Sequence, residues 1–404
     1  MKILFIAGLL LLSFLSGYAA DWNESLAVQA ALANNRDLRA ARRTLDEAEA
    51  RLRGAGRLSN PEIEVVVAGG RDFEGRIEIG LTQYFPLTAR LRLEKSLSRL
   101  ELEAARLEVE ERERIISSQV RTAFLSLAAA REGQDLRRRQ SDTASTTAKS
   151  LTTQAREGFV SSLDATQASL EASQLRADGE TSRAEAAEAA GKLATLLGLP
   201  PSDPLPLKDN LSLPRSLPAA RSPDGRPDLR LAAIAITAAE HDLGLARAMR
   251  WQDIGIGLFV EGERFRDEPE GIENEALLGM KLSLPLPVWQ NGSAAVAERE
   301  ATAARRQLML EALQLAAAHQ ANSSWQQMKI LFTAARQMED DVLPLARKLL
   351  TDTQASHDRG ETDLQSLFRA RQRFIEVETT ALEARIAFHR ARAAWIFATS
   401  PSSN

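Results

Sequence analysis

The stretch from Arg90 to Glu157 constrains this chain more than any other feature of its sequence. It contains no proline and one glycine, Gly133. Leucine and alanine recur in it at spacings of three and four, which predicts a continuous helix with a coiled-coil seam. At about 1.5 Å per residue such a helix extends on the order of 100 Å. We therefore expect a helical rod rather than an ordinary compact domain.

The N-terminus has the pattern of an export signal. Lys2 is followed by an apolar run from Ile3 to Leu15, and Gly17 and Ala19 satisfy the small-residue cleavage rule. We interpret residues 1–19 as a cleaved signal peptide. The chain has no cysteine, which fits an exported protein without disulfides. A net charge of −4 with both signs interspersed argues against nucleic acid as a partner.

Four short segments alternate apolar with polar or small residues, which is typical of strands. They lie at about 61–69, 76–86, 252–260 and 276–286. The acidic segment 261–275 is interpreted as a solvated loop, and residues 23–55 as one helix. Residues 198–227 hold eight of the fifteen prolines and are interpreted as a linker outside the core.

The chain also repeats itself. Arg36-Asp37-Leu38-Arg39 matches Pro227-Asp228-Leu229-Arg230, and Gly158 matches Gly360. We interpret residues 20–197 and 228–404 as two copies of one unit, joined by the linker 198–227. Each copy holds a helix, a β-hairpin, a long helix and a return helix. The long helices span about 90–157 and 293–359, and Pro344 is expected to kink the second.

Four strands cannot close into a membrane barrel, because single-chain barrels begin at about eight strands. An open sheet with exposed apolar residues is prone to aggregate. We therefore expect several chains to share one barrel. Tyr84, Phe85, Trp251 and Trp289 all fall on the helix side of the strands, where an aromatic belt at a membrane interface would lie. The alternative is that these are ordinary core residues.

With this duplicated architecture and two glycine-centred turns, the chain resembles the outer membrane efflux protein family, the TolC-like channels. Its size and the Leu343-Pro344-Leu345-Ala346 turn make it most similar to the heavy-metal-efflux, CzcC-like branch. The resemblance implies a mainly α fold with a small β part. It implies a homotrimer with a 12-stranded β-barrel in outer membrane lipid, above an α-helical periplasmic tunnel. The implied partners are a periplasmic adaptor protein and an inner-membrane RND-type pump.

The resemblance assigns roles to two turns. The first matches the family pattern G-x-x-S-x-L-D and ends at Asp164. The family docks its adaptor at such turns, so the implied docking residues are Gly158, Phe159, Val160, Gly360 and Glu361. In the second turn, Ser366 and Arg369 occupy the two family positions that narrow the pore, and Thr362 occupies the position of an arginine that helps lock the closed state. With Asp164 these three are the candidate constriction residues. Arginine and serine replace two acidic residues there, so a constriction at this level is expected to be neutral or basic.

No catalytic constellation, phosphate-binding loop or metal-ligand spacing is present in the sequence. We therefore expect no enzyme activity, no cofactor and no metal site. The leading hypothesis is a passive exit duct in the outer membrane, with a periplasmic tunnel, for metal cations or small molecules. One alternative is a type I protein secretion channel of the same fold. The other is a periplasmic coiled-coil scaffold without a pore, against which the repeated strand pairs argue.

Overall fold

The computed structural model describes residues 22–69, 75–200, 205–208, 211–267 and 271–400. The predicted signal peptide and most of the first hairpin turn, residues 70–74, lie outside these ranges. The chain divides into two compact units. We call the first, Met1–Arg39, Arg112–Asp224 and Ala317–Asn404, the tip unit, and the second, Ala40–Glu111 and Gly225–Ala316, the sheet unit. Each unit combines segments of both sequence repeats, so the units cut across the repeats.

The two long helices begin where the sequence predicts. Helix α3 covers Arg90–Arg156 without interruption over 67 residues. The second consists of α6, Ser293–Gln337, a π-helical turn, Met338–Val342, and α7, Leu343–Asp358. The wider turn comes directly before Pro344. Proline has no N–H to donate and its ring crowds the carbonyl four residues earlier, so the helix widens there.

The expectation of one helix over residues 23–55 was wrong. The structure has α1, Glu24–Asn34, and α2, Arg36–Gly54, separated by Asn35 in an extended conformation. The Asn35 side chain accepts a hydrogen bond from the Leu38 N–H at 3.1 Å and donates one to the Leu196 carbonyl at 3.0 Å. Because this amide caps α2 and also binds the end of α4, the break is more stable than a continuous helix.

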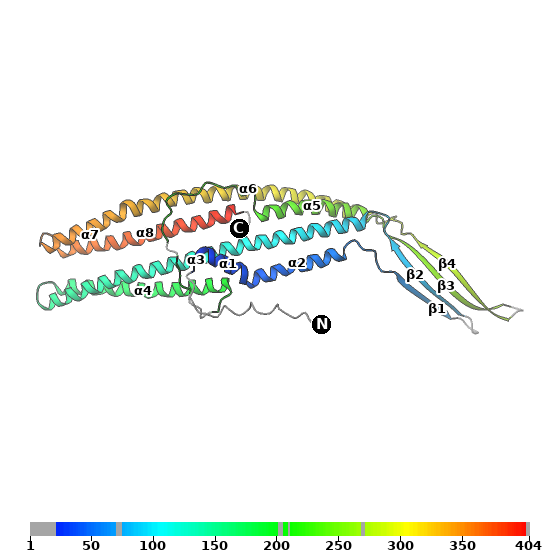
Figure 1. The fold of residues 1–404 in the computed structure, drawn as a ribbon, viewed down its shortest axis with the longest axis horizontal. Coiled ribbons are helices and arrows are strands. Elements are labelled where there is room, and N and C mark those ends of the chain that lie inside the picture. The colour runs from blue at the N-terminus through cyan, green and yellow to red at the C-terminus, as the bar shows by residue number, and fades with distance from the viewer. Residues whose placement is uncertain (1–21, 70–74, 201–204, 209–210, 268–270, 401–404) are drawn as a thin grey trace, which may run out of the picture. The chain divides into compact units, whose positions relative to one another are not determined.

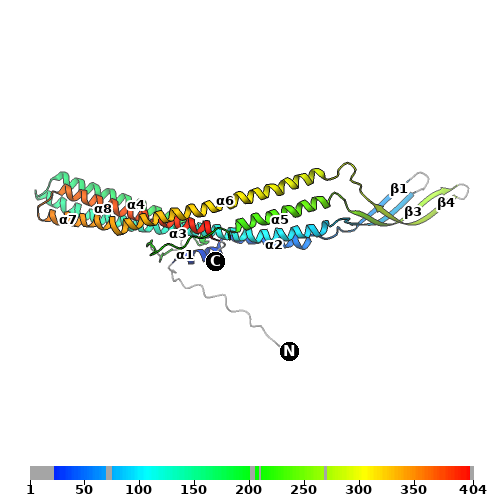
Figure 2. The same cartoon turned by 90° about the horizontal axis from the view of Figure 1, so that it is seen from above.

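The tip unit contains two helical hairpins, α3 with α4, Ser162–Leu197, and α7 with α8, Leu364–Thr399 (Figures 1 and 2). Their core is rich in alanine, which lets helix backbones approach closely. One core cluster joins α3, α4 and α8 through Ala144, Ala148, Leu151, Ala165, Ala168, Ala172, Leu175 and Phe368. Another joins α6 and α8 through Met328, Ala335, Phe388, Ala391 and Trp395.

The expectation that residues 198–227 stay outside the core was also wrong. Leu205 and Leu211 are each only 4% exposed. The extended backbone of this segment cannot satisfy its own polar groups, so the neighbouring helices do so. Arg131 donates to the Leu205 carbonyl at 2.6 Å, and the Leu211 N–H donates to Glu132 at 2.6 Å. With these bonds made, Leu205 and Leu211 pack inward.

The sheet unit contains the sheet and α5, Pro227–Ala248. The strands are β1, Glu62–Gly69, β2, Gly75–Phe85, β3, Ile254–Asp267, and β4, Gly271–Ser283. They form an antiparallel sheet in the order β1-β2-β3-β4 (Figure 1). The interpretation of 261–275 as a loop was wrong, because β3 and β4 stay paired as far as Asp267 and Gly271.

The register places most of the apolar residues of the four strands on one face. Two of its cross-strand rows are Ile63–Leu81–Leu258–Met280 and Val65–Ile79–Val260–Leu278. This apolar face is open to solvent in the single chain, with Met280 76% exposed. Alternation of side chains puts most of the charged residues of the strands on the opposite face, with Arg264 as an exception. The sheet is therefore amphipathic, and its apolar face has no cover among the described residues.

Candidate functional site

The first candidate site is the turn between α3 and α4, residues 157–164, which we call the first tip. Gly158 has φ +82°, a value that glycine adopts without steric cost. Its N–H donates to the Ala155 carbonyl at 3.2 Å, and the Phe159 N–H donates to the Gln154 carbonyl at 2.9 Å. Ser161 then caps α4 by accepting from the Leu163 N–H at 3.1 Å. These bonds end one helix and start the next with five residues between them.

The turn between α7 and α8, residues 359–366, is the second tip and has the same backbone geometry. Gly360 has φ +75°. Its N–H donates to the His357 carbonyl at 2.8 Å, and the Glu361 N–H donates to the Ser356 carbonyl at 2.9 Å. Asp363 caps α8 by accepting from the Ser366 N–H at 3.0 Å. Both tips therefore use the same two backbone bonds at the same offsets from their glycine, and each has a capping side chain three residues after it.

The surface chemistry of the two tips differs. Phe159 is 77% exposed on the first tip and Leu163 is also exposed, while Val160 packs partly against the core cluster beneath. On the second tip, Arg359 forms an ion pair with Glu361 at 2.7 Å. The first tip thus offers an apolar surface and the second a charged one.

Two acidic groups of the second tip have shifted pKa values. The hydrogen bond from Arg359 lowers the pKa of Glu361 below its usual value. Hydrogen bonds from the Ser366 side chain and backbone lower the pKa of Asp363, and the charge of Arg369 adds to this. Both carboxylates are therefore stabilised in their ionised form.

Three of the four predicted constriction residues lie together. Thr362, Ser366 and Arg369 line one groove of about 470 Å³ between α7 and α8. Arg369 donates to the Ser366 hydroxyl at 3.1 Å. Asp352 and Ser356 of α7 form the opposite wall. Asp164 is half-buried on the first tip and does not line this groove.

Behind the tips, polar contacts connect α3 and α8 at intervals of about seven residues. Arg371 donates to the Thr147 hydroxyl at 2.7 Å, Gln140 donates to Glu378 at 3.3 Å, and Arg385 pairs with Glu132 at 3.1 Å. Arg385 also lies 3.4 Å from Glu339 in the π-helical turn. The sequence analysis missed this ladder, although the seven-residue spacing of Arg371, Glu378 and Arg385 on α8 is a readable signal.

The end of this ladder nearest the tips contains a partly buried charge pair. Burial raises the pKa of Glu171 on α4, and the charge of Arg371 opposes that shift. Burial also lowers the pKa of Arg371, while Glu171 opposes the change. The two groups therefore offset part of each other's desolvation where α3, α4 and α8 meet.

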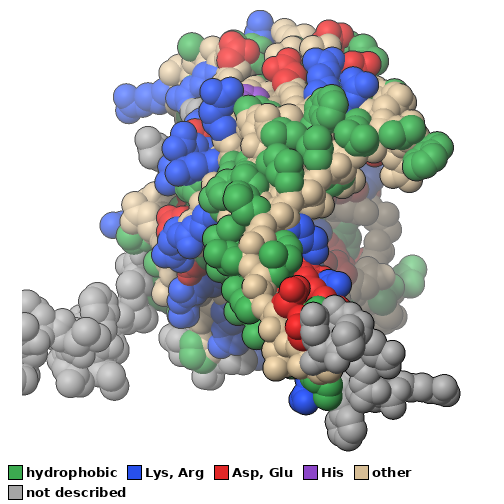
Figure 3. Space-filling view, turned by 90° about the vertical axis from the view of Figure 1, so that its right-hand side faces the viewer, with side chains coloured by type: hydrophobic (Ala, Val, Ile, Leu, Met, Phe, Trp, Pro, Cys, Tyr) green, Lys and Arg blue, Asp and Glu red, His purple; other side chains and the backbone are tan. Residues whose placement is uncertain are grey.

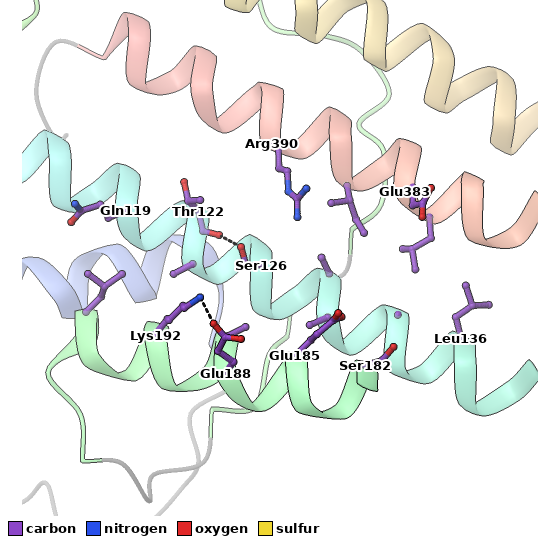
Figure 4. A pocket seen from close by; sticks show the side chains of 18 of the residues that line it. Gln119, Thr122, Ser126, Leu136, Ser182, Glu185, Glu188, Lys192, Glu383 and Arg390 are labelled. Carbon is purple, nitrogen blue, oxygen red and sulfur yellow. Dashed lines mark hydrogen bonds and ion pairs between the residues drawn. The ribbon is translucent and has the colours of Figure 1, made fainter. Parts of the chain in front are cut away.

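A larger groove of about 950 Å³ lies among α3, α4 and α8 (Figure 4). Ala123, Ala129, Ala130 and Gly133 leave room along α3. Charged side chains line it as well: Lys192 and Glu188 of α4 form an ion pair at 2.5 Å, and Arg390 and Glu383 of α8 face them. The sequence analysis did not predict this groove, although the short residues of α3 are a signal for it.

The four aromatic residues expected at a membrane interface lie at one end of the sheet. Phe85 pairs with Ile254, the first residue of β3, so the end of β2 and the start of β3 coincide. Tyr84 precedes Phe85, Trp251 precedes β3, and Trp289 follows β4. Trp289 is 94% exposed and Trp251 is exposed, whereas Tyr84 is only partly exposed. For Trp251 and Trp289 this exposure disfavours a core role within one chain.

Among the described residues, no group of three or more His, Cys, Asp or Glu side chains is arranged to hold a metal ion.

None of the described helices is both long enough and apolar enough to cross a membrane.

Comparison with known proteins gives a sequence match and several structural matches. Residues 27–199 match the family model described as outer membrane efflux protein. No curated protein matches the chain. The fold is similar to crystal structures of CusC, with TM-score 0.77 and 18% identity over 94% of this chain and 92% of CusC.

Two further solved structures are similar to the same extent. One is the outer membrane protein VceC of Vibrio cholerae, with TM-score 0.75 and 16% identity over 93% of this chain and 95% of VceC. The other is the open state of the MtrE outer membrane channel of Neisseria gonorrhoeae, with TM-score 0.75 and 18% identity over 93% of this chain and 88% of MtrE. At such identities the structural likeness establishes the fold.

Proposed function

We propose that this chain is a passive exit duct of a tripartite efflux system. Residues 27–199 match the outer membrane efflux protein model, and the fold is that of the TolC-like channels. The predicted resemblance to that family and the mainly α fold with a small β part are confirmed. The duct lies in the outer membrane, and an inner-membrane RND-type pump supplies the energy.

The amphipathic sheet is the observation that carries this proposal. Its apolar face spans all four strands and lies exposed, and its outer strands β1 and β4 each have one edge unpaired within the sheet. An unpaired edge beside an apolar surface is costly both in water and in lipid. A periplasmic scaffold without a pore has no use for such a sheet.

A homotrimer in a membrane covers the exposed apolar face with lipid and also pairs the free edges of β1 and β4. In an antiparallel sheet of four strands β1 and β4 run in opposite directions, so β4 of one copy pairs antiparallel with β1 of the next. Three copies give a closed 12-stranded barrel with the apolar face toward lipid and the charged face toward the lumen. Trp251, Trp289, Phe85 and Tyr84 then lie at the interface between the membrane and the periplasm.

The two tips form the periplasmic end of the tunnel. Phe159, Val160 and Glu361 contact the periplasmic adaptor, and Gly158 and Gly360 hold the turns in shape. Thr362, Ser366 and Arg369 share one groove, which supports a common role for them at the constriction. Asp164, on the other tip, takes part only if both tips face the pore.

The substrate of the proposed duct is a metal cation or a small molecule. The metal assignment follows the Leu343–Ala346 turn of the heavy-metal-efflux branch. A type I protein secretion channel has the same fold and is the second candidate. Loss of the gene would lower resistance to metal salts in the first case and would stop export of a protein in the second.

Cysteine cross-linking tests the trimer, because the chain has no native cysteine. We expect Val65→Cys on β1 together with Leu278→Cys on β4 to give covalent dimers and trimers with a flexible bismaleimide. Each single variant should give much less cross-linked product. Monomers alone, or ladders beyond the trimer, would contradict the closed barrel.

Conductance in planar bilayers tests the channel and its constriction. We expect wild-type protein to give small discrete steps and Arg369→Asp to increase cation selectivity. Gln167→Asp is the comparison variant, since Gln167 occupies the same offset from Gly158 that Arg369 has from Gly360. Conductance steps with unchanged ion selectivity would show that Arg369 does not line the lumen. Absence of conductance, together with fractionation as soluble periplasmic material, would contradict the duct and support the periplasmic scaffold.

A further inference from the structure

The half of the sheet that leads into the helices carries glycines on its charged face. The register places Gly80, Gly255, Gly257 and Gly279 there, in three neighbouring cross-strand rows. Figure 3, viewed from the end at which the strands lie, shows a hydrophobic band beside acidic side chains, as expected for a sheet with two unlike faces. Glycine weakens a strand, because it packs no side chain and loses more backbone freedom on folding. These positions therefore need a reason for the missing side chains.

The aromatic ring of Phe259 supplies that reason at Gly279. Phe259 on β3 has Gly80 of β2 and Gly279 of β4 as its direct cross-strand partners. A Cβ atom at Gly279 would overlap the Cζ atom of Phe259 and would lie 2.6 Å from Cε1 and 3.0 Å from Cε2. The ring occupies the place that a side chain at position 279 would take. It therefore lies across β4, against the wall of the sheet.

The glycine on the other side of Phe259 does not hold the ring. The nearest atom to a Cβ at Gly80 would be the Cβ of Phe259 at 3.6 Å, an ordinary contact. The arrangement at Gly279 recurs one row from the end of the same face. There a Cβ at Gly255 would lie 3.0 Å from Cε1 and 3.3 Å from Cδ1 of Tyr84, its partner on β2. Both aromatic rings of this region thus lie over a glycine of the neighbouring strand.

We propose that Gly279 is a positioning residue that holds Phe259 flat and thereby keeps the lumen of the barrel open at this row. The inference rests on the proposed function, because the charged face lines a lumen only when three copies close the barrel. Side chains fill the interior of a barrel of about eight strands, whereas about sixteen strands leave an aqueous channel. A 12-stranded barrel lies between these sizes. The direction of three large rings, one from each copy, therefore decides how wide the path is.

The flat ring depends on the two glycines that flank it. A phenylalanine side chain on a strand has only a few staggered orientations. A methyl group at position 279 removes the orientation that the ring now has, and Gly80 offers a second recess in the same row. Methyl groups at both positions leave the upright orientation, which points into the lumen. Replacing both glycines should therefore narrow the path.

Cysteine labelling of intact cells tests the inference, because the chain has no native cysteine. Glu62 on β1 is exposed, shares the charged face and lies one row closer to the helices than Phe259. A reagent that enters from the exterior must pass Phe259 to reach the thiol of Glu62→Cys. The probe is the largest polyethylene glycol maleimide that labels this thiol in the otherwise wild-type protein. Gly80→Ala/Gly279→Ala should slow its reaction roughly tenfold, because upright rings would fill much of a barrel of this size.

Three controls accompany the measurement. Gly80→Ala alone adds a methyl group to the same row without meeting the ring, and it should leave the rate unchanged. Phe259→Ala in the double-alanine variant should restore the rate, which a general loss of folding would not allow. Glu263→Cys lies on the same face two rows nearer the hairpin turns, so its labelling should not change in any background.

The outcomes separate the inference from the proposed function. An unchanged rate in the double-alanine variant, or no recovery with Phe259→Ala, would overturn the inference and leave the duct in place. Phe259→Ala in the presence of both glycines decides the case where the double variant does not assemble. A flat ring obstructs little, so a marked acceleration would overturn the inference. If both thiols react only after the outer membrane is permeabilised, the proposed duct is contradicted, and the inference with it.

Discussion

The two tips share one backbone and present two different surfaces. Gly158 and Gly360 have φ of +82° and +75°, the same two backbone hydrogen bonds surround each, and a side chain three residues later caps the next helix. Their exposed side chains have diverged, with Phe159 on one tip and the Arg359–Glu361 ion pair on the other. Helix reversal constrains the glycine and the cap and leaves the outward residues free. A partner that contacts both tips therefore meets one apolar and one charged surface.

The largest effects should follow from changing the glycines, and they should be equal at the two tips. A Cβ at Gly158 or Gly360 would meet no atom within 4 Å, so the cost of Gly→Ala is conformational only. We expect about 1–2 kcal/mol at each tip. Hydrogen exchange of the Phe159 and Glu361 amides measures it, and Gly→Asn should cost less. A loss of stability at one tip alone would contradict the equal dependence of the two turns on their glycines.

Adaptor binding should distinguish the tips next. We expect Phe159→Ser to weaken binding of the purified adaptor about tenfold, because an exposed aromatic residue loses its contact. Leu170→Ser is the control, since Leu170 is also exposed on α4 but lies farther along the helix. Equal effects of the two variants would argue that the apolar surface of the first tip is not the contact.

The caps should respond differently to pH. Asp363 has a lowered pKa in the folded protein, so its stabilisation is complete above the ordinary aspartate pKa of about 3.9 and is lost as pH falls through the folded value. Glu361 acts in the same direction. Ser161 does not titrate. Amide exchange at Ser366 should therefore accelerate on acidification and that at Leu163 should not, after correction for intrinsic rates. Asp363→Asn should remove the difference.

The smallest effect should come from Arg359→Gln. Its ion pair with Glu361 is exposed, and exposed pairs contribute little to stability. We expect unchanged amide exchange at Glu361 and a weaker salt dependence of adaptor binding. A large loss of stability would show that the second tip depends on its charges more than the first depends on Phe159.

Local patterns predicted much of the secondary structure and of the tips. The start of α3 at Arg90, the strand cores around Val65 and Ile79, and the two glycines all follow from spacing along the chain. The errors came where distant residues intervene. Asn35 breaks a helix because Leu196 accepts its hydrogen bond, and Leu211 is buried because α3 satisfies its backbone.

The candidate sites also contain residues that the sequence predicted and features that depend on packing between distant segments. Family resemblance pointed to Thr362, Ser366 and Arg369, and the groove that holds them together needed the packing of α7 against α8. The ladder from Arg371 to Arg385 and the partly buried Glu171 were missed, because their importance depends on partners more than a hundred residues away.

The sequence by itself determined the lengths of the rods, the alternation of the strands and the places where the chain reverses. These depend on hydrogen bonds and side-chain periods within a few residues. Only the tertiary structure decided that the strands stand in the order β1-β2-β3-β4, with Leu81 facing Leu258 and Glu263 facing Glu275. That register puts one apolar and one acidic face on the sheet, and neighbours across strands are a property of pairing rather than of sequence distance.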